Sequence, residues 1–470
     1  MFGRRLRLFT MALLGLSALL AAAPGCSAEE PSGKTAPVGQ EVRLTIYDRG
    51  TALIEETRRL ELPKSGDLHW KEVPKTLDAT SIQLAGPAGL QVLEERFLYD
   101  PMTHERLIKA SRGKRVVLVE TSEETGREKR TEAVVVAADG PPVYRIGDEI
   151  HLGHPGRVVL PALPEGLHPK PEIVWRVQGA GGEADLTARY LAGGLNWSAD
   201  YVLHVEEESL AGSLSGAFTL TNSSGTDFDS AQVQLVAGEV RRAAAPQPVR
   251  MMMAAEAKME RADEAPVADL HRYTVDGPVS LEDGRTVRVG FLQAEGLKLA
   301  RRYEIRGGWV GWSAYRPQED KLPVAVVWLL NNTAKAGLGK PLPAGTVRLY
   351  VAEGQKPLIL AGEVAMRHTP AGVEEVKLET GEAFDFVATR RQKSFKQLSK
   401  ELSESSWTVK VENKKETAVA VRVIENVPAQ AEVVSASHKA ERPSADRLEF
   451  NVEVPAGGKV EVAYTIRVRR

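Results

Sequence analysis

From residue 42 to the C-terminus, short runs of alternating apolar and polar residues follow one another, separated by turn residues. The run "VRLTIYDRGTALIEETRRLEL" (42–62) alternates on both sides of Asp48-Arg49-Gly50, which is typical of a β-hairpin. In residues 406–470 the strand-like runs recur about every 8–12 residues, a spacing typical of a β-sandwich. This pattern predicts an all-β, multi-domain chain.

Turn signals and shifts of composition divide the chain into segments. We predict a lipoprotein signal peptide (1–25), a flexible tether (26–41), an N-terminal β domain (42–105), a small β-barrel (106–165), a β-sandwich (166–305), a second β-sandwich region (306–400) and an immunoglobulin-like C-terminal domain (401–470). Two stretches break the β pattern. Residues 241–268, biased toward Ala, Met, Pro and charge, predict a disordered loop, and residues 393–405 could form one or two helical turns.

The N-terminus has the features of a secretory signal. Three arginines within residues 1–7 precede an apolar run that ends at Ala23. That run is shorter than the roughly 20 residues that a membrane-spanning helix needs. The following Gly25-Cys26 pair suits lipoprotein processing, although Ala23 stands where Leu is usual. The sequence therefore predicts export.

Cys26 is the single cysteine of the chain, so no internal disulfide can form. We predict that Cys26 carries a lipid that anchors the protein to a membrane; the alternative is an unused thiol lost with the signal. Ser27 follows it, without the Asp that would indicate inner-membrane retention. We expect an outer-membrane lipoprotein that faces the periplasm.

The charge balance argues against a nucleic-acid partner. The chain has 61 basic and 63 acidic residues, and loss of the three signal arginines leaves 58 against 63, a net charge of −5. A nucleic-acid-binding protein normally presents a basic face. We expect membrane and envelope partners instead.

Two groups of residues invite a metal hypothesis, but neither supports one well. His151 and His154 would lie on opposite faces of a strand, and their spacing matches no zinc motif. Met251, Met252, Met253 and Met259 could offer thioethers to copper, but no His or Cys lies among them. We therefore predict no metal and no cofactor.

No residue pattern predicts catalysis. The chain has no G-x-S-x-G elbow, no phosphate-binding loop and no dinucleotide fingerprint. Ser198 and Asp200 stand close together, but only the fold could bring His204 back to them. Nothing singles out a carboxylate pair among 63 acidic residues. We predict no catalytic residue.

The best candidate for binding is "GGWVGWSAYRP" (307–317), where Trp309, Trp312 and Tyr315 recur at three-residue spacing. Aromatic side chains exposed on such a Gly-rich segment could stack on a glycan or contact a partner protein. The alternative is that they fill an inter-sheet core, which is the commoner use of aromatic residues.

Several segments, taken in order, resemble the domain of unknown function 4139 family, which is related to mucoidy inhibitor A. They include "LTIYDRGTALIEETRRLELP", "YLAGGLNWSADY", "GAFTLTNSSGTDFDSAQVQLVAGEV" (216–240), "NNTAKAGLGKPLPAGTVRLY" (331–350), "LAGEVAMRHTP" (360–370) and "GEAFDF" (381–386). The resemblance covers about residues 42–470, although the long coiled coil of the mucoidy-inhibitor type is missing. It implies an all-β exported protein, with no catalytic residues or cofactor to carry over.

Within this resemblance, "YLAGGLNWSADY" (190–201) predicts two neighbouring strands joined at Gly193-Gly194. The glycines permit a positive φ or a close backbone approach. Trp197 would enter the core, and Ser198 and Asp200 would lie on the other face. We interpret the stretch as structural.

Two functions follow from the sequence. The favoured one is a membrane-anchored, non-catalytic scaffold or interaction module of the cell envelope. The alternative is an envelope hydrolase, acting on glycan or peptide at a site between domains. Convergent Asp, Glu or His side chains with raised carboxyl pKa values would favour the hydrolase.

Overall fold

The structure is a computed structural model that describes residues 40–122, 125–179, 181–238, 271–310, 315 and 318–469. Nearly all elements in these residues are β-strands, together with the short helix α1 (His104–Ala110) and two single turns of 3₁₀ helix. The predicted all-β, multi-sheet fold is therefore confirmed.

The body of the chain repeats one antiparallel three-strand meander four times. In each copy the middle strand pairs with the other two. The copies are β1 (Gln40–Tyr47), β2 (Thr51–Leu62) and β12 (Gly182–Gly193); β13 (Leu195–Glu206), β14 (Ala211–Asn222) and β18 (Arg285–Lys298); β19 (Ala300–Trp309), β21 (Val324–Asn332) and β24 (Val373–Glu382); and β25 (Phe386–Gln397), β26 (Leu402–Asn413) and β31 (Lys459–Arg469).

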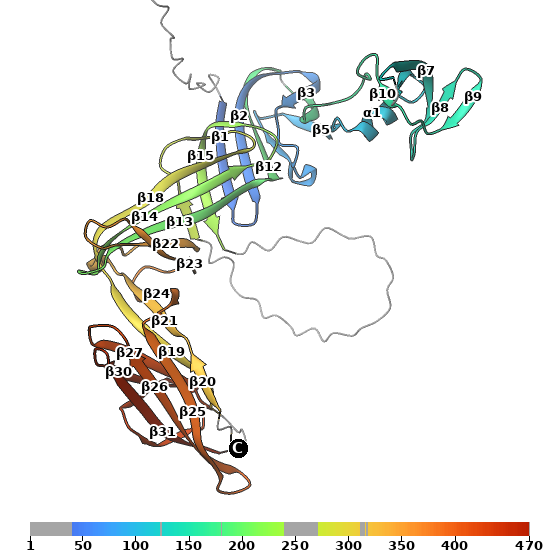
Figure 1. Cartoon of the computed structure of the whole chain (residues 1–470). Coiled ribbons are helices and arrows are strands. Elements are labelled where there is room, and N and C mark those ends of the chain that lie inside the picture. The colour runs from blue at the N-terminus through green and yellow to red at the C-terminus, as the bar shows by residue number, and fades with distance from the viewer. Residues whose placement is uncertain are drawn as a thin grey trace, which may run out of the picture.

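The copies are directly consecutive along the chain: the last strand of each one leads into the first strand of the next. Only Gly194 separates β12 from β13, only Leu299 separates β18 from β19, and residues 383–385 separate β24 from β25. Each copy belongs to its own sheet, and we call these the first, second, third and fourth sheets. Figure 1 shows the sheets stepping from the blue strands to the red ones.

Between its second and third strands, each later copy sends a segment back to the preceding sheet. There, the first strand of the returning segment lies parallel to the first strand of the preceding meander. The parallel pairs are β15 (Phe228–Ala237) with β1, β22 (Gly345–Ala352) with β13, and β27 (Val419–Asn426) with β19. Consecutive sheets are therefore tied together by strand exchange.

Eight further strands extend the edges of these four sheets. They are β4 (Gln83–Ala85), β16 (His271–Thr274) and β17 (Val279–Leu281) on the first sheet, β23 (Ile359–Met366) on the second, β29 (Ala440–Ser444) and β30 (Arg447–Val454) on the third, and β20 (Glu319–Leu322) and β28 (Glu432–Ala436) on the fourth.

Sheet pairing cuts across the segments expected from the sequence. The segment 42–105 holds β1, β2, β3 (Ser65–Lys71) and β5 (Gln91–Leu98), but these strands pair with β12, β15 and β11 (Glu172–Gln178). The segment 401–470 likewise shares its sheets with β19 and β25. Pairing partners far apart in sequence cannot be recognised from local alternation.

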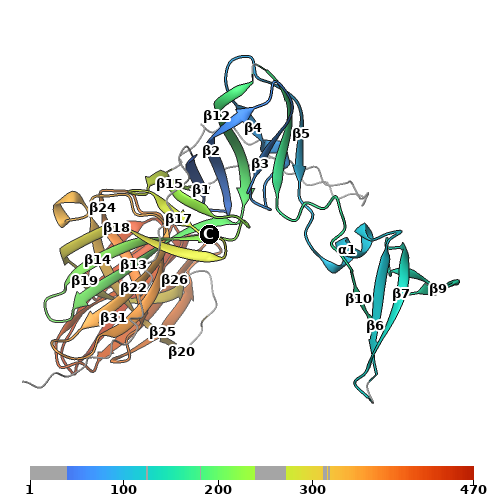
Figure 2. The same ribbon diagram turned by 90° about the horizontal axis from the view of Figure 1, so that it is seen from above.

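Residues 104–160 form a separate unit that projects from the rest in both ribbon views (Figures 1 and 2). It contains α1 and five strands: β6 (Arg115–Thr121), β7 (Glu128–Ala137), β8 (Val143–Ile146), β9 (Glu149–Leu152) and β10 (Arg157–Val159). We predicted a small β-barrel in 106–165, and that is wrong. The sheet runs β10-β6-β7-β8-β9 and is open, because its outer strands do not pair as closure requires.

The helical turns considered for 393–405 are also absent from the structure. These residues form the turn and flanks of the β25–β26 hairpin, in which Gln397 pairs with Ser403. The Leu398 and Ser399 N–H groups both donate to the Leu402 carbonyl. Cross-strand pairing along the whole hairpin overrides the weak local helical preference.

Three hydrophobic clusters fill the fold. The largest lies between the first and second sheets and also takes side chains from β21 and β24 of the third sheet. A second fills the space between the third and fourth sheets. A small third cluster lies within the 104–160 unit, around Leu118 and Val135.

Candidate functional site

The stretch that contains Trp197 forms a corner between two sheets. We predicted β12 and β13 as neighbouring strands, and that is wrong: β12 pairs with β2 and β4, whereas β13 pairs with β14 and β22. Gly194 turns the chain with φ +83°, and a Cβ there would lie 3.0 Å from backbone atoms of Ser223 and Ser224. The expected positive φ and close approach are thus present at Gly194.

Trp197 packs at the margin of the main core as a structural residue. It is partly buried, with its ring edge-on to Phe218 at 5.7 Å and 6.2 Å from Tyr273. Its indole N–H is buried and has no acceptor among the described residues. The predicted core role holds, but burial of the side chain is incomplete.

The polar residues near Trp197 form no catalytic constellation. Asp200 accepts a hydrogen bond from Thr219 Oγ1 at 2.6 Å and lies 3.5 Å from Arg348 Nη1. The ring of His204 stacks on Tyr350, with the ring centroids 5.5 Å apart. Ser198 is exposed on the face that Asp200 and His204 share. Among the described contacts, no hydrogen bond links the three.

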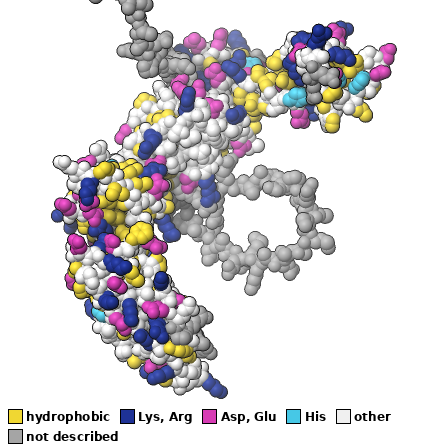
Figure 3. Space-filling view, in the orientation of Figure 1, with side chains coloured by type: hydrophobic (Ala, Val, Ile, Leu, Met, Phe, Trp, Pro, Cys, Tyr) yellow, Lys and Arg dark blue, Asp and Glu magenta, His cyan; other side chains and the backbone are white. Residues whose placement is uncertain are grey.

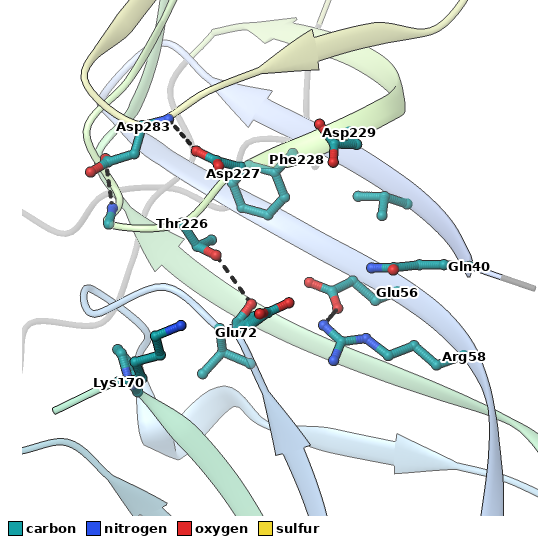
Figure 4. A pocket seen from close by; sticks show the side chains of 14 residues that line it. Gln40, Glu56, Arg58, Glu72, Lys170, Thr226, Asp227, Phe228, Asp229 and Asp283 are labelled. Atoms are coloured by element: carbon teal, nitrogen blue, oxygen red, sulfur yellow. Dashed lines mark hydrogen bonds and ion pairs between the residues drawn. The ribbon is translucent and has the colours of Figure 1, made fainter. Parts of the chain in front are cut away.

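A polar pocket of about 400 Å³ lies on the first sheet (Figure 4). It lies where β1 and β2 meet the end of β3, the β14–β15 turn and the segment before β11. Charged side chains dominate its lining: Glu56, Arg58, Glu72, Lys170, Asp227, Asp229 and Asp283. We call it the polar pocket.

Glu56 forms the floor of the polar pocket and is 2 % exposed. Its carboxylate accepts hydrogen bonds from Tyr190 Oη at 2.6 Å and Trp70 Nε1 at 3.2 Å, and it pairs with Arg58. Arg58 lies over the Trp70 ring at 4.4 Å and donates to the Lys71 carbonyl at 2.8 Å. Burial and the adjacent carboxylate raise the pKa of Tyr190, so its phenol stays a donor.

Glu56 was missed from the sequence, although a signal for it exists. In β2 the core-facing positions are Ala52, Ile54 and then Glu56, so a charged residue continues the phase of the apolar ones. A carboxylate in that phase must be buried, and a buried carboxylate requires donors. Only the fold shows that the donors come from Trp70 and Tyr190.

The rim of the polar pocket is built from turns held by carboxylates. Thr226 donates to the Glu72 carbonyl at 3.2 Å, and Glu72 has a positive φ of 61°. Asp283 accepts from the Gly225 N–H, and its own N–H donates to Asp227, both at 2.8 Å. These hydrogen bonds stabilise the turns that form the rim. Across the described residues, no group of three or more His, Cys, Asp or Glu side chains could hold a metal ion.

The predicted contact residues are accessible where the structure describes them. Trp309 ends β19 and is 56 % exposed, and Tyr315 is 49 % exposed. Trp312 lies outside the described residues, as do Cys26 and the whole of 241–268. Beside Trp309, the backbone is fixed by the N–H of the fully buried Val310, which donates to the Asn426 carbonyl at 2.8 Å.

A buried ion pair lies directly beneath this segment. Glu425 and Arg390 are 0 % and 5 % exposed at their side chains, with Arg390 Nη2 2.9 Å from Glu425 Oε2. Arg390 also lies 3.9 Å above the Trp407 ring. Gly307 is required here, because a Cβ would lie 2.1 Å from Glu425 Oε2. The pair therefore supports the backbone that leads into Trp309.

The histidines considered as metal ligands have other contacts. His151 lies on β9 beside Glu149, and His154 Nδ1 accepts a hydrogen bond from the Gly156 N–H at 2.9 Å. The four methionines lie outside the described residues. Within the described ranges, no helix has both the length and the apolar character to cross a membrane.

Repeated three-strand meanders that exchange strands between successive sheets define the class of this protein: a serial, all-β multi-sheet protein. A family model for "Domain of unknown function (DUF4139)" matches residues 186–470, and the chain belongs to this family. The match begins inside β12 and includes the three later meanders. No curated protein matches the sequence.

Proposed function

We propose that the protein is an exported lipoprotein of the cell envelope, anchored through Cys26, that works as a non-catalytic scaffold or interaction module. Its contact surface includes Trp309 and Tyr315, at the end of β19 and in the segment that follows. The partner is an envelope protein or a glycan.

The exposure of Trp309 carries this proposal. Of the six described tryptophans, four are at most 8 % exposed and Trp197 is partly buried, whereas Trp309 is 56 % exposed. Covering a solvated indole with a partner buries a large apolar area, which favours binding. Tryptophan is also enriched among the interface residues that contribute most of the binding free energy. Because Val310 and Asn426 fix the neighbouring backbone, little ordering is needed on binding.

The charge pattern is compatible with specific contacts rather than with attraction to one sign of charge. On the face shown in Figure 3, acidic and basic side chains are interspersed along the chain. A protein that acts through long-range attraction would present one sign of charge over a wide area.

Membrane anchoring is tested separately from binding. The Cys26→Ala variant should leave the membrane fraction and appear in the soluble periplasmic fraction, since a lipid anchor depends on that thiol. The anchoring proposal is wrong if the variant still sediments with membranes.

Binding is tested in the native envelope by cross-linking and pull-down, with sedimentation on purified peptidoglycan as the glycan arm. Trp309→Ala should weaken recovery of the partner roughly 30-fold, because loss of a central interface tryptophan costs about 2 kcal/mol. The control is Leu152→Ala, which removes an 86 % exposed side chain from the separate 104–160 unit. Equal recovery by both variants would overturn the assignment of the surface.

The same purified proteins test the hydrolase alternative. If the wild type releases fragments from peptidoglycan, or cleaves envelope peptides, in a way that Glu56→Gln abolishes, the non-catalytic proposal is wrong. The three hydrogen-bonding partners of Glu56 lead us to expect no such activity.

A further inference from the structure

A second cavity, of about 300 Å³, lies between the first and second sheets, away from the polar pocket and from Trp309. Its walls come from three parts of the chain: β14 with β18, the strand β16, and the segment 340–342 that precedes β22. Its volume is at the lower end of the range found for small-molecule sites, so it suits one ring-sized group. We call it the aromatic cavity.

The inner wall of the aromatic cavity is a cluster of rings. Phe218 and Phe291 stack with their centroids 4.1 Å apart and their planes at 17°, and Tyr273 leans against Phe218 at 5.8 Å. Trp197 supports the same ring of Phe218 from the side. Burial raises the pKa of Tyr273 to about 12, so the wall carries no negative charge at neutral pH. Flat apolar groups pack well against such a wall.

Two cationic residues help to line the aromatic cavity: Arg272 from β16, and Lys340 from the segment before β22. Both residues are exposed, and within the described part of the chain neither forms an ion pair. Arg272 differs in this from most of the described arginines, which contact carboxylates as Arg348 contacts Asp200 and Glu363. Two unpaired cations beside an apolar cavity complement a ligand that is anionic at one end.

The segment that holds Lys340 is fixed before any ligand arrives. The Lys340 carbonyl accepts a hydrogen bond from Asn332 Nδ2 at 2.9 Å, and Tyr201 Oη donates to the Pro343 carbonyl at 2.8 Å. Leu342 is fully buried and exchanges backbone hydrogen bonds with Thr369. A preformed wall lowers the ordering cost of binding.

We propose that the aromatic cavity binds a small amphiphilic anion: a flat apolar ring system that lies against Phe218, Phe291 and Tyr273, with one acidic group held by Arg272 and Lys340. The surface at Trp309 and this cavity are separate sites, so either can be correct without the other.

Two matched probes test the ring and the charge separately in the full-length protein. Anilinonaphthalene sulfonate carries an anion on its rings, and N-phenylnaphthylamine has the same rings without the charge. The wild type should bind one sulfonate probe per chain, saturably and more weakly as salt rises, and should bind the neutral probe on the order of tenfold more weakly.

The Arg272→Gln/Lys340→Gln double variant should bind the sulfonate probe on the order of tenfold more weakly, with its affinity for the neutral probe unchanged. Arg288→Gln is the control, because Arg288 is an exposed arginine of β18 outside the cavity lining. Energy transfer from tryptophan to the bound probe should fall in Trp197→Phe, since Trp197 lies beside the ring wall.

Two results would overturn the proposal. One is sulfonate binding that is equal in the wild type and the double variant. The other is binding that never saturates at one probe per chain, which indicates nonspecific attachment. Thermal unfolding of every variant identifies any loss of fold, because a destabilised protein binds more of the probe rather than less.

Discussion

At the scale of single residues, the buried ion pair of Glu425 and Arg390 constrains its surroundings strongly. Burial outweighs the attraction of Arg390 and raises the pKa of Glu425 to about 6. Removing one partner would leave an uncompensated buried charge, so the pair must be kept or lost together. Gly307 is tied to it, because any side chain there would collide with the carboxylate.

The raised pKa of Glu425 predicts a pH dependence of stability with a definite sign. The folded protein holds the proton more tightly than the unfolded chain does, whose carboxyl has a pKa near 4.5. The protonated Glu425 carboxyl therefore makes its full contribution to the free energy of unfolding below about pH 4.5, and this contribution is lost as pH rises through 6. A shift of this size corresponds to about 2 kcal/mol.

Urea unfolding at several pH values measures this contribution. The stability difference between wild type and Glu425→Gln should become less favourable to the wild type by about 2 kcal/mol between pH 4 and 7. Glu453→Gln, at an exposed site on β30, should show little such change. A difference that stays constant, or rises with pH, would contradict the assignment.

At the scale of elements, three strands end in the same way. The last residues of β14, β21 and β26 are Asn222, Asn332 and Asn413, and all are fully buried. In each, the side-chain amide donates to backbone carbonyls of the turn and of a second segment. These are the points at which the chain leaves one sheet for the preceding one. We infer that the asparagine fixes that crossover.

Replacement of Asn413 should show how much such a crossover depends on its asparagine. Its Nδ2 donates to the carbonyls of Thr417, Val454 and Pro455 at 2.9–3.2 Å. Asn413→Ala should cost about 2–4 kcal/mol in the free energy of unfolding, because buried carbonyls lose their donor. Asn451→Ala, at an exposed site, should cost about 0.5 kcal/mol or less. If chemical denaturation shows similar losses of stability for the two variants, Asn413 has no special role at the crossover.

The sequence predicted elements better than it predicted their partners. Strand alternation is local, so an all-β fold could be inferred from runs such as 42–62. Pairing is not local: Thr57 and Thr187 are hydrogen-bonded across 130 residues, and Gly194 separates two sheets instead of joining two neighbours. The aromatic surface at Trp309 could be proposed because its motif is local in the sequence. The hydrogen-bond donors to Glu56 could not be predicted, because tertiary folding brings them to it.

At the scale of the whole molecule, the four sheets form a series. Neighbouring sheets exchange strands and contribute side chains to the same hydrophobic clusters. The third sheet belongs to two cores at once. Val324 of β21 lies in the cluster between the third and fourth sheets, which we call the C-terminal cluster, whereas Trp328 and Leu330 of the same strand lie in the largest cluster, the main core. Among the described residues, the 104–160 unit alone has a hydrophobic cluster that it shares with no other sheet. Coupling between the cores should therefore be strong, and coupling to that unit weak.

This arrangement predicts that the two large cores unfold together. Unfolding of the third and fourth sheets would withdraw Trp328, Leu330, Val376 and Leu378 from the main core, at about 1.5–3 kcal/mol for each side chain that becomes exposed. Phe450→Ala, in the C-terminal cluster, should lower the single main calorimetric transition as a whole, whereas Leu118→Ala should shift only a smaller, separate transition of the 104–160 unit. If Phe450→Ala splits the main transition and moves only one part, the shared sheet does not couple the cores, and the series consists of independently stable sandwiches.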